Sequence, residues 1–141
     1  VLYRAEDKSG IGIGRRTSRL GYATSVDGVT FQRRSTPVFY PDNDLQKSLE
    51  WPGGCEDPRI AVTVDGLYVM MYTQWNRDIP RLAVATSKDL VHWTKYGPAF
   101  AKAYDGKFYN MACKSGSILT ELIDGRQVIK KLKKLKKVVD K

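Results

Sequence analysis

The 141-residue chain has few of the residues on which metal sites and disulfide frameworks depend. It contains one histidine, His92, and two cysteines, Cys55 and Cys113. A structural zinc site needs four such ligands at close spacing, so we expect no metal. The two cysteines are far apart and lie in no Cys-x-x-Cys motif. A single disulfide stays open, and two free thiols in a reducing, cytoplasmic compartment are the favoured interpretation.

Long apolar runs and a balance of charge are also lacking. No stretch approaches the ~18–20 apolar residues of a membrane helix, and no charged-then-apolar signal peptide opens the chain. The formal net charge is +9, but residues 129–141 hold seven Lys and one Asp, a net +6, which leaves +3 for residues 1–128. The body is therefore near neutral, and we expect neither nucleic acid nor membrane as its partner. With 42% hydrophobic residues, it is predicted to be globular.

The remaining sequence alternates between short strand-like runs and turns. Runs rich in β-branched and aromatic residues are separated by clusters of Gly, Pro, Asp and Asn, which is typical of an all-β fold. Asp65-Gly66 and Asp27-Gly28 are predicted hairpin turns, because glycine tolerates a positive φ. The expected strands are Val1–Ala5, Leu20–Ser25, Thr30–Arg33, Ile60–Val64, Leu67–Thr73, Leu82–Ala85 and Ser117–Leu122.

An internal repeat makes the fold prediction more specific. Residues 19–33 (RLGYATSVDGVTFQR) and 81–95 (RLAVATSKDLVHWTK) are identical at seven of fifteen positions, and Phe31 is matched by Trp93. Cys55 and Cys113 open a second pair of related segments. A repeat of this size with about four strands is typical of a β-propeller blade. Because propellers close with 4–8 blades, we expect the chain to be a fragment of about two blades; the alternative is a duplicated β-sandwich.

The densest group of reactive side chains is the run from Trp51 to Arg59 (WPGGCEDPR). In a regular strand, Glu56 and Asp57 would point to opposite faces, so only one of them would meet a substrate. The aligned residues of the other copy are Lys114-Ser115, so the scaffold repeats while the chemistry differs. A turn-capping carboxylate beside a surface arginine explains the same residues equally well.

Several runs together resemble glycoside hydrolase family 130. They are LYRAED (2–7), RLGYATS (19–25), GCEDPR (54–59), YTQWNR (72–77), RLAVATS (81–87) and CKSG (113–116), covering roughly residues 1–128. The resemblance implies a five-bladed β-propeller, of which residues 1–128 are a partial ring. It also implies an inverting phosphorylase that converts β-1,4-mannosyl-glucose and phosphate to α-mannose 1-phosphate and glucose.

The resemblance also implies roles for individual residues. Asp57 becomes the general acid, acting through a hydroxyl of the mannosyl unit, with Glu56 as a contributor. Because phosphate is already an anionic nucleophile, cations replace the base of an inverting hydrolase. Inorganic phosphate is a co-substrate and no cofactor is expected. The protein is expected to form a homo-oligomer. The expected phosphate ligands are Arg77, Lys114 and, in reserve, Arg81; the expected substrate contacts are Arg4, Asp7, Arg59, Asn76 and Trp75.

Other side chains are given plain structural roles. Arg81 matches Arg19 in the repeat, so a repeated ion pair is a strong alternative for it. Trp93 is expected in the core, and His92 is expected to be exposed and inert. Trp51 is a weaker candidate than Trp75 for a sugar platform.

The end of the chain departs from the resemblance. In residues 129–141 apolar residues recur every third position between Lys pairs, which suits a basic amphipathic helix or a truncated, frame-shifted end. Two alternatives to a phosphorylase stay open: a β-mannoside hydrolase of the same fold, and a non-catalytic propeller fragment whose basic tail binds anions.

Overall fold

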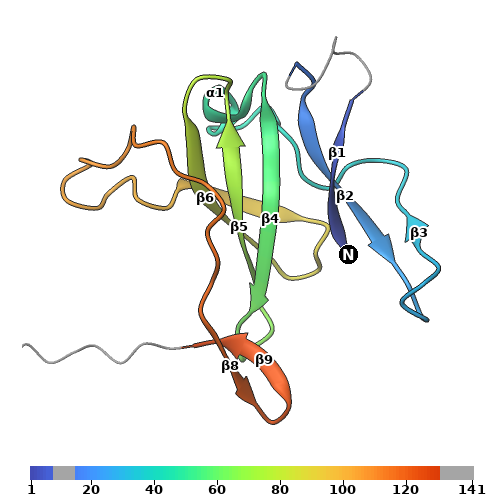
Figure 1. The fold of residues 1–141 in the computed structure, drawn as a ribbon. Helices are drawn as coiled ribbons and strands as arrows, with labels where there is room; N and C mark the ends of the chain where they lie inside the picture. Colours follow the sequence, from blue (N-terminus) through green and yellow to red (C-terminus); the bar gives the residue numbers. More distant parts are fainter. Residues whose placement is uncertain (8–14, 131–141) are drawn as a thin grey trace, which may run out of the picture.

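The computed structural model describes residues 1–7 and 15–130, and most of the Lys-rich segment 129–141 lies outside them. Within the described residues the chain forms nine strands and one short helix, which confirms the all-β prediction. Six strands follow one another in a sheet of order β1-β2-β4-β5-β6-β7, with β3 paired to β2, while β8 and β9 form a separate hairpin (Figure 1). The elements are β1 (Leu2–Glu6), β2 (Ser18–Thr24), β3 (Gln32–Arg33), α1 (Lys47–Glu50), β4 (Gly54–Val62), β5 (Tyr68–Trp75), β6 (Pro80–Ser87), β7 (Trp93–Pro98), β8 (Thr120–Ile123) and β9 (Arg126–Ile129).

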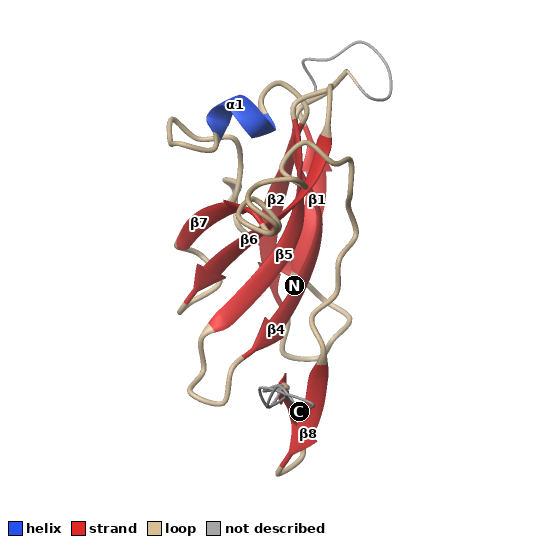
Figure 2. Cartoon of the chain, turned by 90° about the vertical axis from the view of Figure 1, so that its left-hand side faces the viewer, coloured by secondary structure: helices blue, strands red, loops and turns tan. Residues whose placement is uncertain are grey.

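The helix and the separate hairpin lie at opposite ends of the sheet. Both views place α1 at the end where β4 begins and β5 ends, and β8 at the other end (Figure 2). The Asp65-Gly66 turn joins β4 and β5 as predicted, with Gly66 at φ +89°. Strands β7 and β9 and helix α1 were not expected from sequence, and the strand expected over Ser117–Leu122 begins only at Thr120.

The internal repeat is visible as a repeated turn. After β2, the Ser25 hydroxyl accepts the amide of Gly28, and Asp27 Oδ1 accepts those of Val29 and Thr30. After β6, Ser87 and Asp89 do the same for the amides of residues 90, 91 and 92. Hydrogen bonds from backbone amides stabilise the ionised form, and the pKa of Asp27 lies well below its usual range, with the Thr30 amide as the largest cause. The Ser-x-Asp identity of the repeat therefore encodes a turn.

Strand β2, which carries the first copy of the repeat, runs beside the start of β4. Their single parallel pair joins Ser18 to Gly54. Gly54 has φ +119°, and a Cβ there would overlap the Ser18 backbone. The second glycine of the Gly53-Gly54 pair is thus required by the close approach of two segments of the chain.

A continuous apolar cluster joins the copies. Its buried members come from β2, β4, β5, β6 and the segment before α1; they are Leu20, Phe39, Cys55, Met70, Tyr72, Ala83 and Ala85. Phe39 meets the Tyr72 ring edge-on at 4.7 Å between centroids and the Trp93 ring at 5.9 Å. Trp93 packs against this cluster, as its place in the repeat predicts. No helix in the described part of the chain is long and apolar enough to cross a membrane.

Candidate active site

The Glu56-Asp57 pair lies on an irregular part of β4. Between Glu56 and Arg59 the pairing with β5 shifts register, and Asp57 has φ +49°. A β-bulge of this kind re-aims side chains that a regular strand would send to opposite faces. The alternation assumed from sequence therefore does not hold at this point, and both carboxylates reach the same partner.

That partner is Arg4 on β1. Its guanidinium lies 3.1 Å from Glu56 Oε1 and 3.6 Å from Asp57 Oδ1, and it also binds Glu6 at 2.9 Å. The side chains keep some solvent contact, with 39% of Arg4, 14% of Glu56 and 29% of Asp57 exposed. One cation thus collects three carboxylates where β1 and the start of β4 approach each other. We call Arg4, Glu6, Glu56 and Asp57 the carboxylate cluster.

Ser18 at the start of β2 ties the carboxylate cluster to the backbone. Its hydroxyl donates to Glu56 Oε1 at 2.9 Å and accepts the Arg4 Nε proton at 3.1 Å. Its amide donates to the carbonyl of Gly53 at 2.8 Å. Ser18 itself is almost completely buried, so these bonds are partly shielded from water. Sequence reasoning missed Ser18, because its role depends on a contact between segments 38 residues apart.

The three cations expected to hold phosphate do not join this cluster. Arg77 is exposed on the β5–β6 turn and donates to the carbonyl of Arg15. Arg81 is 95% buried; it donates to the carbonyls of Tyr109 and Ile79 and to Asn110 Oδ1. Because these acceptors are neutral, Arg81 has a structural role. It does not form the ion pair that its match with Arg19 in the repeat suggested. Lys114 is exposed, next to Cys113, whose amide donates to the Pro80 carbonyl.

Arg77 and Lys114 nevertheless lie at the same end of the sheet as the start of β4. Gly54 pairs with Trp75, and Trp75 pairs with Pro80, to which the segment carrying Lys114 is bonded. Neither cation forms an ion pair with a carboxylate of the described residues, so both side chains are available to an anion.

The residues expected to contact sugar are scattered. Asn76 caps the β5–β6 turn by accepting the amides of Asp78 and Ile79. Asp7 pairs with Arg19 at 3.7 Å. Arg59 is exposed and lines a cavity of roughly 330 Å³ between β4 and the β8–β9 hairpin.

The tryptophan, histidine and cysteine side chains differ in how far they are exposed. Trp75 covers Gly53 so closely that a Cβ there would overlap its ring, while Trp51 is 51% exposed. His92 is exposed, as predicted, and its Nδ1 lies 2.6 Å from Asp89 Oδ2. Cys55 and Cys113 are free thiols, as favoured from sequence.

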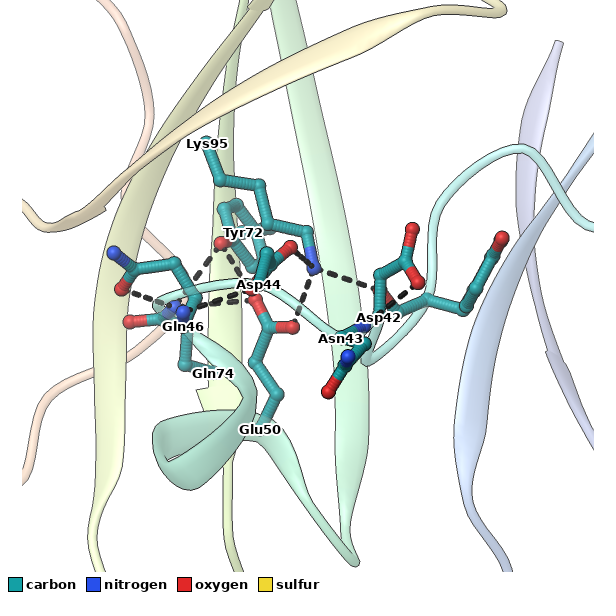
Figure 3. A network of polar contacts seen from close by, with 9 residues as sticks. Asp42, Asn43, Asp44, Gln46, Glu50, Tyr72, Gln74 and Lys95 are labelled. Carbon is teal, nitrogen blue, oxygen red and sulfur yellow. Dashed lines mark hydrogen bonds and ion pairs between the residues drawn. The ribbon is translucent and has the colours of Figure 1, made fainter.

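A buried polar network around the end of α1, just before β4, was not predicted from sequence. It centres on Glu50, the last residue of α1, whose side chain is fully buried. Lys95 from β7 and Tyr72 and Gln74 from β5 surround its carboxylate (Figure 3). Burial raises the pKa of Tyr72 well above its usual value, as it does for Cys55, and the negative charge of Glu50 adds to both shifts. These two side chains are therefore neutral.

The sequence and the fold are similar to those of known proteins. The profile of glycoside hydrolase family 130, described as beta-1,4-mannooligosaccharide phosphorylase, matches residues 1–139. The 1,2-beta-oligomannan phosphorylase of Thermoanaerobacter sp. (strain X514) is 38% identical over 136 residues, covering 92% of this chain and 40% of the relative.

Solved structures are still more similar. A glycosyl hydrolase from Bacteroides ovatus is 80% identical, with a TM-score of 0.90 over 93% of this chain and 36% of that one. A structure from work on family-130 glycoside hydrolases that target beta-1,2 mannosidic linkages in Candida mannan is 79% identical, with the same TM-score and coverage. The chain thus spans well under half the length of the relatives it matches. Across almost all of its own length, it belongs to glycoside hydrolase family 130, the family of mannoside phosphorylases.

Proposed function

We propose that the whole protein cleaves β-mannosides with inversion and that Asp57 supplies the proton to the leaving sugar. The observation that supports this role is the bulge that brings Asp57 and Glu56 to one arginine. Of the three carboxylates in the cluster, Asp57 makes the longest contact with Arg4, at 3.6 Å. It is therefore the carboxyl least committed to the protein and most available to a substrate hydroxyl.

In this proposal phosphate accepts the mannosyl group. An inverting hydrolase needs a second carboxylate to activate water, whereas phosphate arrives as an anion and needs cations to hold it. Lys114 and Arg77 are exposed, unpaired with any described carboxylate, and at the end of the sheet where β4 begins. Arg81 is the weakest of the three candidates, because binding phosphate would cost it three hydrogen bonds.

The family resemblance of the sequence implies β-1,4-mannosyl-glucose as the substrate, giving α-mannose 1-phosphate and glucose. The description of the family profile names a β-1,4 linkage. The names of two curated relatives, at 38% and 31% identity, name β-1,2 linkages instead. We therefore propose a β-linked mannosyl donor and treat the two linkages as rival substrates in one assay.

Hydrolysis is the second candidate, and two observations favour it. The structure that is 79% identical comes from work on glycoside hydrolases of this family. In addition, the only cation within 4 Å of Asp57 in the described chain is Arg4, while Glu6 and Glu56 supply further carboxylates nearby. A carboxylate that activates water is what an inverting hydrolase needs and a phosphorylase does not.

One assay distinguishes these reactions. The whole protein is incubated with β-1,4-mannosyl-glucose or β-1,2-mannobiose, with and without inorganic phosphate, and the products are followed by NMR. Mannose 1-phosphate formed only with phosphate supports the phosphorylase, and free mannose formed at the same rate without phosphate supports the hydrolase. If neither disaccharide is cleaved, or if Asp57→Asn cleaves at the wild-type rate, the proposed function is wrong.

A further inference from the structure

The buried network around Glu50 lies directly before β4, the strand that carries Glu56 and Asp57 of the carboxylate cluster. Glu50 Oε1 accepts the Tyr72 hydroxyl at 2.8 Å and Gln74 Nε2 at 3.1 Å, and Oε2 accepts Lys95 Nζ at 2.6 Å. Both carboxylate oxygens are therefore occupied by side chains from the sheet (Figure 3). A single turn of helix, which has little stability by itself, is in this way fixed to β5 and β7.

Lys95 connects Glu50 to the segment that precedes α1. Besides Glu50, its ammonium donates to the Tyr40 carbonyl at 2.7 Å and lies 3.1 Å from Asp44 Oδ2. All three of its protons thus have partners, and its charge lies 5.0 Å from the Phe39 ring centroid. The Lys95 side chain is only 9% exposed.

A buried ion pair of this kind is weak evidence for stability. The cost of removing two charges from water offsets most of their attraction, and apolar residues of similar size often stabilise as well. What the pair does supply is a fixed direction, because an ion pair with its hydrogen bonds satisfied permits few alternative arrangements. The segment whose geometry this ion pair can fix is the one that follows Glu50 in the chain.

A very short connection joins Glu50 to β4. Only Trp51, Pro52 and Gly53 separate Glu50 from β4. The carbonyls of Pro52 and Gly53 accept the Thr17 hydroxyl and the Ser18 amide, and Cys55 lies opposite Gln74 in the sheet. The start of β4 is therefore held from two sides, by Thr17 and Ser18 at the start of β2 and by the Glu50 network.

We propose that Glu50 and Lys95 are positioning residues, which hold the start of β4 so that Asp57 meets the substrate in its reactive orientation. The inference rests on the proposed function for its catalytic consequence, since Glu50 and Lys95 contact neither Asp57 nor Glu56. Loss of the Lys95 charge leaves the buried Glu50 carboxylate without a cation, and loss of the Glu50 charge leaves Lys95 with the partly exposed Asp44 as its carboxylate partner. The segment from Gly53 to Asp57 then loosens, while the chemical groups of Glu56 and Asp57 are unchanged. The signature is a fall in kcat with little change in KM.

The test compares Glu50→Gln and Tyr72→Phe with the wild-type whole protein. Tyr72→Phe removes one hydrogen bond to Glu50 and no charge, so it remains informative if Glu50→Gln fails to fold. Glu121→Gln, on β8 and outside the network, is the matched control. Two measurements are made on each variant: hydrogen exchange of the peptide containing residues 53–57, and kcat and KM for the disaccharide that the wild type cleaves.

We expect exchange in residues 53–57 to accelerate about tenfold or more in Glu50→Gln and severalfold in Tyr72→Phe, with Glu121→Gln unchanged. We expect kcat to fall by one to two orders of magnitude in Glu50→Gln, with KM within about twofold of wild type, consistent with the loss caused by ~1 Å of misplacement. Lys95→Arg, which keeps the charge, should retain more activity than Lys95→Met.

Two results overturn the inference. The first is unchanged hydrogen exchange of residues 53–57 in both Glu50→Gln and Tyr72→Phe. The second is faster exchange in Glu50→Gln together with a wild-type kcat, in an enzyme that Asp57→Asn inactivates. A wild-type protein that cleaves neither disaccharide contradicts the proposed function instead. In that case the exchange measurement still decides whether the network holds the strand.

Discussion

Replacement of Arg4 by methionine separates the electrostatic role of this residue from its bulk. Arg4 contacts three carboxylates at 2.9, 3.1 and 3.6 Å, and its Nε donates to Ser18. Methionine keeps most of the side-chain length and removes every one of these contacts. Three carboxylates then remain together without a cation.

The magnitude follows from the exposure of the partners. Partly exposed ion pairs each contribute about 0.2–1 kcal/mol, so we expect Arg4→Met to lower the free energy of unfolding by about 1–2 kcal/mol in total. The effect on the reaction is larger, because Glu56 and Asp57 repel each other once unpaired and the bulge loses its anchor. A displacement of ~1 Å at a reacting group costs about 100-fold in rate, and we expect kcat to fall by that factor.

The assay measures initial rates on the disaccharide that the wild type cleaves, together with thermal unfolding. Arg4→Lys should fall between wild type and Arg4→Met, because lysine keeps the charge but cannot contact several partners as a planar fork. Arg126→Met, at an exposed position at the start of β9, serves as the control for the loss of one surface charge. A wild-type kcat in Arg4→Met would refute the idea that Arg4 organises the carboxylate cluster.

Three further predictions concern stability and thiol reactivity. Gly54→Ala should lower the free energy of unfolding by about 2–5 kcal/mol, since its Cβ overlaps another chain segment, whereas Gly28→Ala, at φ +74° with open space, should lose only about 1–2 kcal/mol in urea titrations. A thiol reagent should label Cys113 quickly and Cys55 only on unfolding, because burial raises the pKa of the Cys55 thiol; equal labelling rates in the native state would contradict this. Burial lowers the pKa of Lys95, but the carboxylates of Glu50 and Asp44 beside it outweigh burial and raise the pKa above its usual value of 10.5. The stability that Lys95 contributes should be complete below pH 10.5 and lost at higher pH, and the melting temperature of Lys95→Met should lack that alkaline step.

The sequence predicted the parts of this molecule that local patterns encode. The Ser-x-Asp identities of the repeat correspond to matching turns after β2 and β6, and Asp65-Gly66 closes the hairpin before β5. Turn residues act through their own backbone, so their effect can be recognised without knowledge of the fold. The Glu56-Asp57 pair could also be recognised, because it stands in a distinctive run of residues.

The long-range parts could not be predicted. The bulge at Asp57 depends on pairing with β5, so the alternation of a regular strand gave a wrong expectation for Glu56 and Asp57. Glu50 and Lys95 are 45 residues apart, and nothing near either of them in sequence indicates a partner. Arginines are equally ambiguous: Arg81 is buried against carbonyl groups while Arg4 collects carboxylates, although both were expected at the site.

The central claim is that Asp57 is the acid of a β-mannoside-cleaving enzyme. The measurement that tests it most directly compares wild type and Asp57→Asn in the whole protein, with matched melting temperatures, on β-1,4-mannosyl-glucose and β-1,2-mannobiose in the presence of phosphate. We expect wild type to release the mannosyl group with inversion from one of the two disaccharides and Asp57→Asn to be at least about 100-fold slower, as expected for the loss of a general acid. An Asp57→Asn protein that keeps the wild-type rate would contradict the account.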